Sequence, residues 1–233
     1  MNHLTELINK LTQIEELGFV KSLRKANTGV GYTLETLLGV EENNDSGADF
    51  GNIELKAKRD RTSGSRLSSF TQAPIWLTNS RKVVKTHGEW KEEKQRINFY
   101  TTVKFGTKNP QGLSLKIEDA TLYLHSAKTG SMLARWPLAV LAFRQEQKLS
   151  NMVIVSAKTK GSGDSEEFHY HSADFYSDPS PEMLKSLIED GTIVVDTRMW
   201  LDPSTNKLRD RGTAFRIDKS KVPLMYEKYR RIL

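Results

Sequence analysis

The sequence of 233 residues predicts a mixed α/β (α+β) fold with a largely antiparallel or mixed sheet. Segments with apolar residues three or four apart alternate along the chain with segments in which every second residue is apolar. These two spacings are the periodicities of helices and of half-buried strands. The chain has no internal repeat and no long linker rich in proline, glycine and serine. We therefore expect one structural unit with two lobes around a cleft.

Two helices are predicted near the N-terminus. Leucines and isoleucines three and four apart describe one helical face before Gly18, where the first helix is expected to end. A second helix is predicted over residues 29–38, with Thr28 as its N-cap and Gly39 as its stop. A polar turn over residues 42–47 is expected to follow it.

The rest of the chain is predicted to interleave strands with helices. The segment 97–105 alternates apolar and polar residues most regularly, as a half-buried strand does. In all, we predict strands over 53–58, 97–105, 113–117, 121–125, 132–136, 152–157 and 193–198. Helices are predicted over 138–148, 182–189 and 219–231.

Composition excludes several classes of protein. Because the chain contains no cysteine, it has no disulfide framework, no cysteine-ligated zinc or iron–sulfur site and no cysteine nucleophile. No apolar run approaches the ~20 residues that a membrane-spanning helix needs, and the first ten residues are too polar for a signal peptide. We therefore expect a cytoplasmic protein with no membrane partner.

Positive charge is concentrated in two segments of the chain. Residues 198–233 carry ten basic and four acidic residues, a difference that equals the net charge of +6 on the whole chain. The second segment contains Lys56, Lys58, Arg59, Arg61 and Arg66, with Asp60 as the one acid among them. Such clusters favour binding of nucleic-acid phosphates, although a modest excess also occurs on proteins that bind no nucleic acid.

The segment 49–56, DFGNIELK, carries the residues most indicative of catalysis. Glu54 and Lys56 are two apart on a predicted strand and so share one face, while Asp49 reaches the same strand end through a short turn. Two converging carboxylates form a hard-oxygen site suited to Mg²⁺, and an adjacent ammonium can orient an attacking water. The alternative is a salt-bridged edge strand without a metal.

Three other candidate sites were weighed. Glu35 lies on the second predicted helix, either as an additional acid of the site or as a solvated side chain. His169 and His171 would share one strand face, but without further ligands we interpret them as surface or nucleic-acid-contacting histidines. The glycines at 29 and 31 lack the third glycine and the preceding strand of a dinucleotide-binding motif.

The motifs together resemble the MvaI/BcnI family of Type II restriction endonucleases. The resemblance depends on NTGVG at 27–31, LE at 34–35, ENN at 42–44, DFGNIELK at 49–56 and DRGTAFRI at 210–217. It extends in collinear blocks over 27–74, 97–106, 153–176 and 190–233. One block is catalytic and a distant one is basic, which makes the match more specific than the acid and lysine spacing alone.

The resemblance implies a fold similar to that of MutH, with two lobes clasping DNA and a Mg²⁺-dependent active site. Within one endonuclease unit, residues 1–110 would mainly form the catalytic lobe and residues 190–233 the DNA-recognition elements. By resemblance, Asp49 and Glu54 would hold the metal, Lys56 would position the nucleophilic water and Glu35 would complete the site. The family also implies a monomer that cuts one strand at a time.

The same resemblance implies DNA-binding roles for residues outside the catalytic motif. Gln72 matches a position that reaches towards the minor groove, and Lys104 is a candidate contact to the scissile phosphate. Base readout would fall to Arg198, Arg209, Asp210, Arg211 and Arg216, because arginine can pair with guanine and aspartate with cytosine. The chain has Arg209 where the family members place a histidine, and phosphate anchoring is the alternative role for these arginines.

The expected function is therefore Mg²⁺-dependent cleavage of double-stranded DNA at a short G·C-flanked site of the CCNGG type. A cognate DNA methyltransferase would act on the same site without being a stable subunit. Two alternatives stay open: a MutH-like mismatch-repair nicking enzyme, and a catalytically idle DNA-binding module. Against the idle module, two like charges have little reason to persist side by side unless a cation lies between them.

Overall fold

The structure, a computed structural model, describes residues 2–40, 48–60 and 66–233. The chain forms two compact units: Met1–Ser65, Glu146–Pro179 and Tyr226–Leu233 make the first, and Arg66–Gln145 and Ser180–Met225 the second. The predicted catalytic lobe, residues 1–110, thus draws on both units. The predicted turn over 42–47 and Arg61 lie outside the described residues.

The first unit is built on a five-stranded mixed sheet. Four strands follow the order β1-β11-β10-β2. The fifth strand, β15, also pairs with β11, at a different part of that strand from β1. The β10–β2 pair is parallel, whereas β1, β10 and β15 all run antiparallel to β11. The elements of this unit are α1 (His3–Glu16), β1 (Val20–Lys21), α2 (Gly29–Leu38), β2 (Glu54–Arg59), β10 (Asn151–Lys160), a 3₁₀ turn (Gly163–Ser165), β11 (Glu167–Pro179) and β15 (Tyr226–Arg231).

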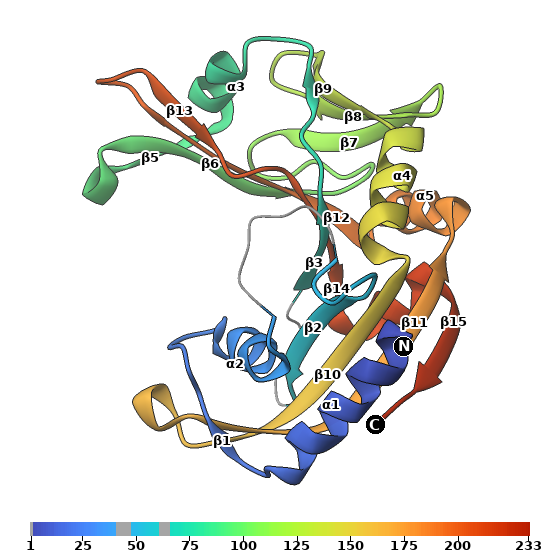
Figure 1. The fold of residues 1–233 in the computed structure, drawn as a ribbon. Helices are drawn as coiled ribbons and strands as arrows, with labels where there is room; N and C mark the ends of the chain where they lie inside the picture. Colours follow the sequence, from blue (N-terminus) through green and yellow to red (C-terminus); the bar gives the residue numbers. More distant parts are fainter. Residues whose placement is uncertain (1, 41–47, 61–65) are drawn as a thin grey trace. The chain divides into compact units, whose positions relative to one another are not determined.

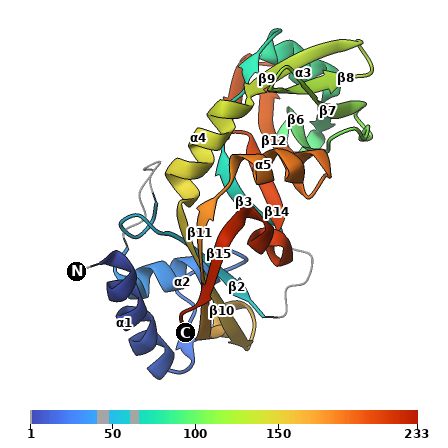
Figure 2. The ribbon, with the colours of Figure 1, turned by 90° about the vertical axis from the view of Figure 1, so that its right-hand side faces the viewer.

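Helices α1 and α2 lie against this sheet (Figures 1 and 2). Their buried leucines, among them Leu7, Leu11 and Leu34, form one apolar cluster with Leu55 of β2 and Val153 of β10. Leu55 and Val153 are register partners, so they lie on the same face of the sheet. Glu54 and Lys56, which flank Leu55, therefore belong to the opposite face.

The second unit contains two sheets. The larger has the order β3-β14-β12-β6-β5 with β13 paired to β12, and the smaller has the order β4-β9-β8-β7. Their strands are β3 (Arg66–Thr71), β4 (Ile75–Trp76), β5 (Glu89–Lys91), β6 (Arg96–Val103), β7 (Leu113–Glu118), β8 (Thr121–Ser126), β9 (Ser131–Pro137), β12 (Ile193–Asp202), β13 (Lys207–Asp210) and β14 (Ala214–Asp218). The helical elements are α3 (Ser80–His87), α4 (Leu138–Leu149, whose last turn belongs to the first unit), α5 (Pro181–Glu189) and 3₁₀ helices over Glu92–Lys94 and Lys219–Met225.

Aromatic packing joins the strands of the second unit. The rings of Phe70 on β3 and Phe215 on β14 stack with centroids 4.8 Å apart, and Trp136 meets Phe215 edge-on at 6.0 Å. All three side chains are buried. Offset and edge-on aromatic pairs add to the stabilisation that burial alone provides.

The predicted mixed α/β class is confirmed, as are most individual elements. Helices α1, α2, α4 and α5 and strands β2, β6, β7, β8, β9, β10 and β12 fall where the periodicities predict them, within a few residues at each end. Gly39 ends α2 in the left-handed conformation, at φ 76°. The described residues contain no helix that is both long and apolar enough to cross a membrane.

Two local predictions are wrong. The predicted helix over 219–231 is a 3₁₀ helix over Lys219–Met225 followed by strand β15. Pro223 has no backbone N–H to donate in an α-helix, and residues 226–231 instead pair antiparallel with β11. Thr28 also fails to cap α2, because its own backbone is helical and its side chain makes no capping hydrogen bond.

Candidate active site

Glu54 and Lys56 lie on β2, the edge strand of the first unit's sheet. They are register partners of Met152 and Ile154 on the parallel strand β10. Their side chains share one face of β2, as the two-residue spacing predicts. Lys56 and Glu54 form an ion pair through Nζ and Oε1.

Glu54 is a buried acid. Its side chain is 1% exposed, and the Lys148 ammonium lies 3.3 Å from Oε2. Oε2 accepts no hydrogen bond from the described residues. Burial raises the pKa of Glu54 above its ordinary value, and the nearby lysines only partly oppose that shift. The site therefore holds a carboxylate with unused coordinating capacity.

Asp49 is positioned by the short turn that leads into β2. Phe50 and Ile53 exchange two backbone hydrogen bonds of 2.9 Å, and Gly51 between them has φ 60°. A Cβ at Gly51 would lie 2.3 Å from a ring nitrogen of His3, so both backbone and space require glycine. Asp49 Oδ2 accepts a 2.9 Å hydrogen bond from the Leu55 amide.

Asp49 and Glu54 are brought together as the sequence predicts. The negative charge of Asp49 contributes to the raised pKa of Glu54, which places the two carboxylates within electrostatic reach. Like charges this close favour binding of a cation that neutralises both. An orphaned buried oxygen beside a second carboxylate is a hard-oxygen donor set that suits Mg²⁺.

Glu35 is placed differently from these three residues. It is half-buried on α2, which covers the sheet face opposite Glu54, and its charge contributes to the raised pKa of Tyr170. Glu35 does not figure among the groups that shift the pKa of Glu54. The described part of the chain contains no cluster of three or more histidines and acids able to hold a metal.

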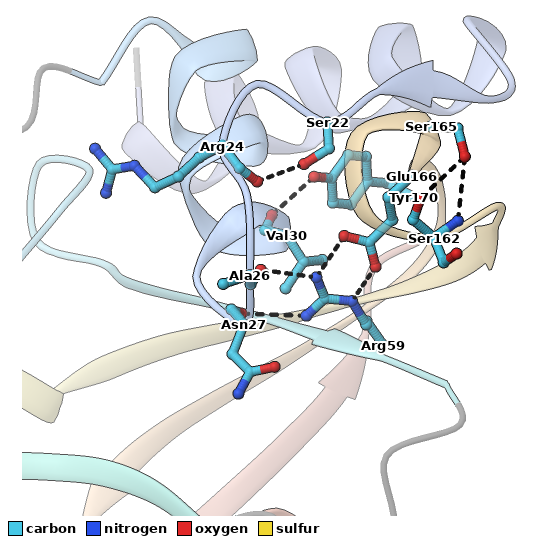
Figure 3. Close-up of polar contacts among 10 residues, drawn as sticks. All are labelled: Ser22, Arg24, Ala26, Asn27, Val30, Arg59, Ser162, Ser165, Glu166 and Tyr170. Atoms are coloured by element: carbon cyan, nitrogen blue, oxygen red, sulfur yellow. Dashed lines mark hydrogen bonds and ion pairs between the residues drawn. The ribbon is translucent and has the colours of Figure 1, made fainter.

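A second ion pair holds the far end of β2. Arg59 Nε and Nη2 each lie 2.8 Å from an oxygen of Glu166. The same guanidinium donates to the carbonyls of Ala26 and Asn27, at 3.2 and 3.1 Å, in the loop that enters α2 (Figure 3). Ala26 has φ 67°, a conformation that non-glycine residues rarely adopt. Arg59 thus links β2 to β11 and to the loop before α2, so its charge serves the fold rather than phosphate binding.

The two histidines considered as ligands lie on β11. His171 Nε2 is 2.8 Å from Asp60 Oδ2, and the His169 ring packs on Phe19 with centroids 5.5 Å apart. The two imidazoles thus contact a carboxylate and an aromatic ring, respectively.

In the second unit, Gln72 and Lys104 follow the ends of β3 and β6. The Gln72 backbone bonds to Thr213 and accepts from the Trp136 indole at 3.0 Å, which fixes the position of the half-buried side chain. Lys104 is exposed, and its carbonyl accepts from the Leu115 amide at 2.8 Å. The Gln72 side chain donates a 3.4 Å hydrogen bond to the Ala73 carbonyl, whereas Lys104 is exposed to solvent.

Three of the predicted base-reading residues are engaged within the protein. Arg198 donates to the carbonyls of Gly212 and Arg211, each at 3.0 Å. Asp210 accepts a 2.7 Å bond from the Gly212 amide. Arg216 pairs with Asp196 at 2.7 Å. These residues shape the 210–216 segment.

Arg209 and Arg211 differ from these three. Both are exposed, and their side chains make no hydrogen bond or ion pair with other described residues. Arg211 lines a pocket of about 360 Å³ together with Tyr100, Thr102, Asp196, Arg198 and Arg216. Of the two exposed guanidinium groups, that of Arg211 therefore lies at the pocket, and Arg209 is not among the residues that line it.

Sequence reasoning missed Lys148 and Asp196. Lys148 has an acid two residues before it, but this pattern occurs elsewhere in the chain without consequence. Its approach to Glu54 depends on the parallel pairing of β2 with β10, which no local pattern predicts. Asp196 could have been suspected as an acid inside an apolar strand, where a buried charge needs a partner.

Comparisons with known proteins agree with this geometry. A family model described as the MvaI/BcnI restriction endonuclease family matches residues 8–226. A solved structure of restriction endonuclease MvaI with its cognate DNA substrate is 26% identical, covers 100% of this chain and 99% of its own, and has a TM-score of 0.83. MvaI in the absence of DNA is 25% identical, with coverage of 100% and 98% and a TM-score of 0.60.

No curated protein sequence matches the chain. The structural likeness confirms the predicted MutH-like restriction-endonuclease fold. Since the family model spans nearly the whole chain, the protein belongs to the MvaI/BcnI family of Type II restriction endonucleases, which are site-specific deoxyribonucleases.

Proposed function

We propose that the protein is a Mg²⁺-dependent endonuclease that hydrolyses both strands of duplex DNA at a short G·C-flanked site of the CCNGG type. The observation that carries the proposal is Glu54, a buried carboxylate with an oxygen that accepts no hydrogen bond from the described residues, next to Asp49 and Lys56. A family membership and a solved relative bound to its cognate DNA support the choice of substrate.

In this proposal Asp49 and Glu54 would hold the metal. The bound Mg²⁺ would supply Lewis-acid stabilisation of the phosphate and lower the pKa of a water nucleophile. Lys56, already paired with Glu54, would hold the attacking water in line with the phosphorus through its remaining N–H donors. Asp49 keeps its position through the Leu55 amide, so both carboxylates are fixed before DNA arrives.

We assign Glu35 an auxiliary role as the additional acid of this site. Because α2 packs beside the edge strand β2 but on the face opposite Glu54, the proposed role is indirect and would act around the strand edge through a water molecule. Glu35→Gln should therefore reduce cleavage less than substitution of Asp49.

For sequence recognition we propose a division of labour in the second unit. Arg209 and Arg211, which are exposed and unpaired within the described chain, would read guanines through bidentate hydrogen bonds. Arg198, Asp210 and Arg216 would hold the readout segment in shape through the bonds described above and meet bases at its edge. Gln72 would contact the minor groove and Lys104 the scissile phosphate.

We further propose that the enzyme acts as a monomer and cuts the two strands in sequence. A cytoplasmic location and a cognate methyltransferase that modifies the same site follow from a restriction role. Each wrong base pair in the site should cost about 1–3 kcal/mol of discrimination.

The test is incubation of the purified protein with a sequenced supercoiled plasmid and Mg²⁺, with ends mapped by run-off sequencing and EDTA as the control. We expect nicked circles that proceed to linear product at one repeated motif. Persistent nicks without linear product would favour a repair-type nicking enzyme instead. Shifted but uncut DNA, across several divalent ions, would favour a DNA-binding module.

Asp49→Asn provides the matched variant for this assay. The amide keeps the size of the side chain and an oxygen acceptor but removes the charge that a cation needs. We expect cutting to be abolished while the gel shift on DNA persists. Undiminished cutting by Asp49→Asn would remove Asp49 from the metal site.

A further inference from the structure

A second lysine reaches Glu54 from outside the catalytic motif. Lys148 lies in the last turn of α4, and its Nζ is 3.3 Å from Glu54 Oε2. The side chain of Lys148 is 20% exposed, so the contact is largely withdrawn from water. Glu54 thus has one ammonium at each oxygen, Lys56 at Oε1 and Lys148 at Oε2.

The Lys148 contact differs from an optimised structural ion pair. Although the ammonium is close, Oε2 lacks a hydrogen bond from any described residue. The buried hydroxyl of Tyr226 also has no partner there, and the charge of Glu54 contributes to its raised pKa. Oε2 is thus a buried oxygen with spare accepting capacity, and such an oxygen indicates that another group can bind there.

We propose that Lys148 is the counter-cation of Glu54 in the metal-free protein and gives up Oε2 when the divalent cation binds. The inference rests on the proposed function, in which Asp49 and Glu54 hold that cation. An ammonium and a divalent ion at the same oxygen repel each other, so the two compete. Lys148 is thereby a positioning residue: it holds the buried carboxylate in place and weakens cation binding by the free protein.

The test measures Mn²⁺ binding directly, by the electron paramagnetic resonance signal of free Mn²⁺, without DNA and at pH 8. Lys148→Met removes the competing charge at similar length, and we expect it to bind Mn²⁺ about tenfold more tightly than the unaltered protein. Lys148→Arg keeps the charge, and its guanidinium can donate to both oxygens of Glu54. We therefore expect Mn²⁺ binding equal to or weaker than that of the unaltered protein. A purely structural lysine would shift both variants in the same direction.

Lys160→Met serves as the control for loss of one positive charge. Lys160 lies on β10 of the same unit and forms an exposed pair with Glu167, at 3.5 Å. We expect its Mn²⁺ affinity to stay within about twofold of the unaltered protein, because exposed charges are screened. A gain in the control equal to that in Lys148→Met would reduce the effect to net charge and overturn the role.

Unchanged or weaker Mn²⁺ binding by Lys148→Met also overturns the proposed role of Lys148. In that case the proposed metal site is still supported if Asp49→Asn loses Mn²⁺ binding. If neither the unaltered protein nor any variant binds Mn²⁺, the role falls together with the proposed metal site. Thermal unfolding of each variant, measured alongside, verifies that the titrated protein is folded.

Discussion

Glu54 and Glu166 are two glutamates of the same unit that cations hold in different ways. Glu166, 13% exposed, has both oxygens 2.8 Å from one guanidinium, that of Arg59. Glu54, 1% exposed, has ammonium groups from two separate elements and one oxygen without a hydrogen bond from the described residues. The comparison shows two kinds of pair: Glu166 uses both of its oxygens in hydrogen bonds to one partner, whereas Glu54 keeps one oxygen without a hydrogen bond from the described part of the chain, as the proposed metal ligand would need.

The largest expected difference between the two glutamates is in catalysis. Glu54→Gln should lower single-turnover cleavage of a plasmid by about three orders of magnitude, because it removes the charge of a proposed metal ligand and the partner of Lys56. Glu166→Gln, the matched control, should change the rate by less than about tenfold. If both variants lose the same fraction of the cleavage rate, the Oε2 oxygen of Glu54 has no role in catalysis.

For folding stability, we expect the ion pair of Glu166 with Arg59 to matter more than that of Glu54. Arg59→Met leaves Glu166 without its guanidinium partner and removes the donors to the Ala26 and Asn27 carbonyls, so we expect a loss of about 3 kcal/mol. Urea unfolding, with the midpoint and slope compared with those of the unaltered protein, measures this loss. A loss below about 1 kcal/mol in the free energy of unfolding would show that the Arg59–Glu166 pair contributes no more than an exposed ion pair.

The pH dependence of stability sharpens the comparison further. The folded-state pKa of Glu54 is raised above its ordinary value of 4.5, so its ionisation opposes folding. The contribution of Glu54 to stability is therefore greatest below pH 4.5 and is lost as pH rises through the folded pKa.

Glu54→Gln should accordingly be more stable than the unaltered protein at pH 8 in EDTA, and the two should converge near pH 4. Thermal unfolding at both pH values tests the sign. A variant that is less stable at pH 8 would show that the two lysines outweigh the burial of the carboxylate.

The smallest expected effects concern two buried tyrosines. The Tyr170 hydroxyl donates a 2.8 Å hydrogen bond to the Val30 carbonyl, so Tyr170→Phe should cost about 1 kcal/mol. The Tyr226 hydroxyl has no partner among the described residues, so Tyr226→Phe should change stability by less than about 0.5 kcal/mol or stabilise slightly. Denaturant titration resolves the two, and equal losses would reveal a partner for Tyr226.

The parts of the site that local sequence determines could be predicted. Asp49, Glu54 and Lys56 lie within eight residues, where strand alternation and one short turn fix their relation. Lys148 could not be predicted, because its contact depends on the pairing of strands far apart in sequence. The same limit applies to Arg198 and Arg216, whose charge suggested base contact before their internal partners were known.

The fold shows a similar division. Regular periodicity predicted most of the longer helices and strands, but β11, the longest strand, was missed. Strand β15 was mistaken for helix because its sequence, YEKYRR, has no apolar alternation and its pairing with β11 is non-local. Pro223 was a local signal against that helix. Strand β14 was missed as an element, since it is short and its pairing with β3 and β12 is non-local.

The path of the chain through its two units restricts how the enzyme can be re-engineered. The second unit is encoded by residues 66–145 and 180–225, separated by the segment that supplies β10 and β11 to the first unit's sheet. The second unit of a relative therefore cannot be transplanted as one contiguous segment without also carrying strands β10 and β11 of the first unit's sheet. A change of cutting specificity in this scaffold would require exchange of both segments together or, if the proposed base readout holds, point changes at Arg209 and Arg211.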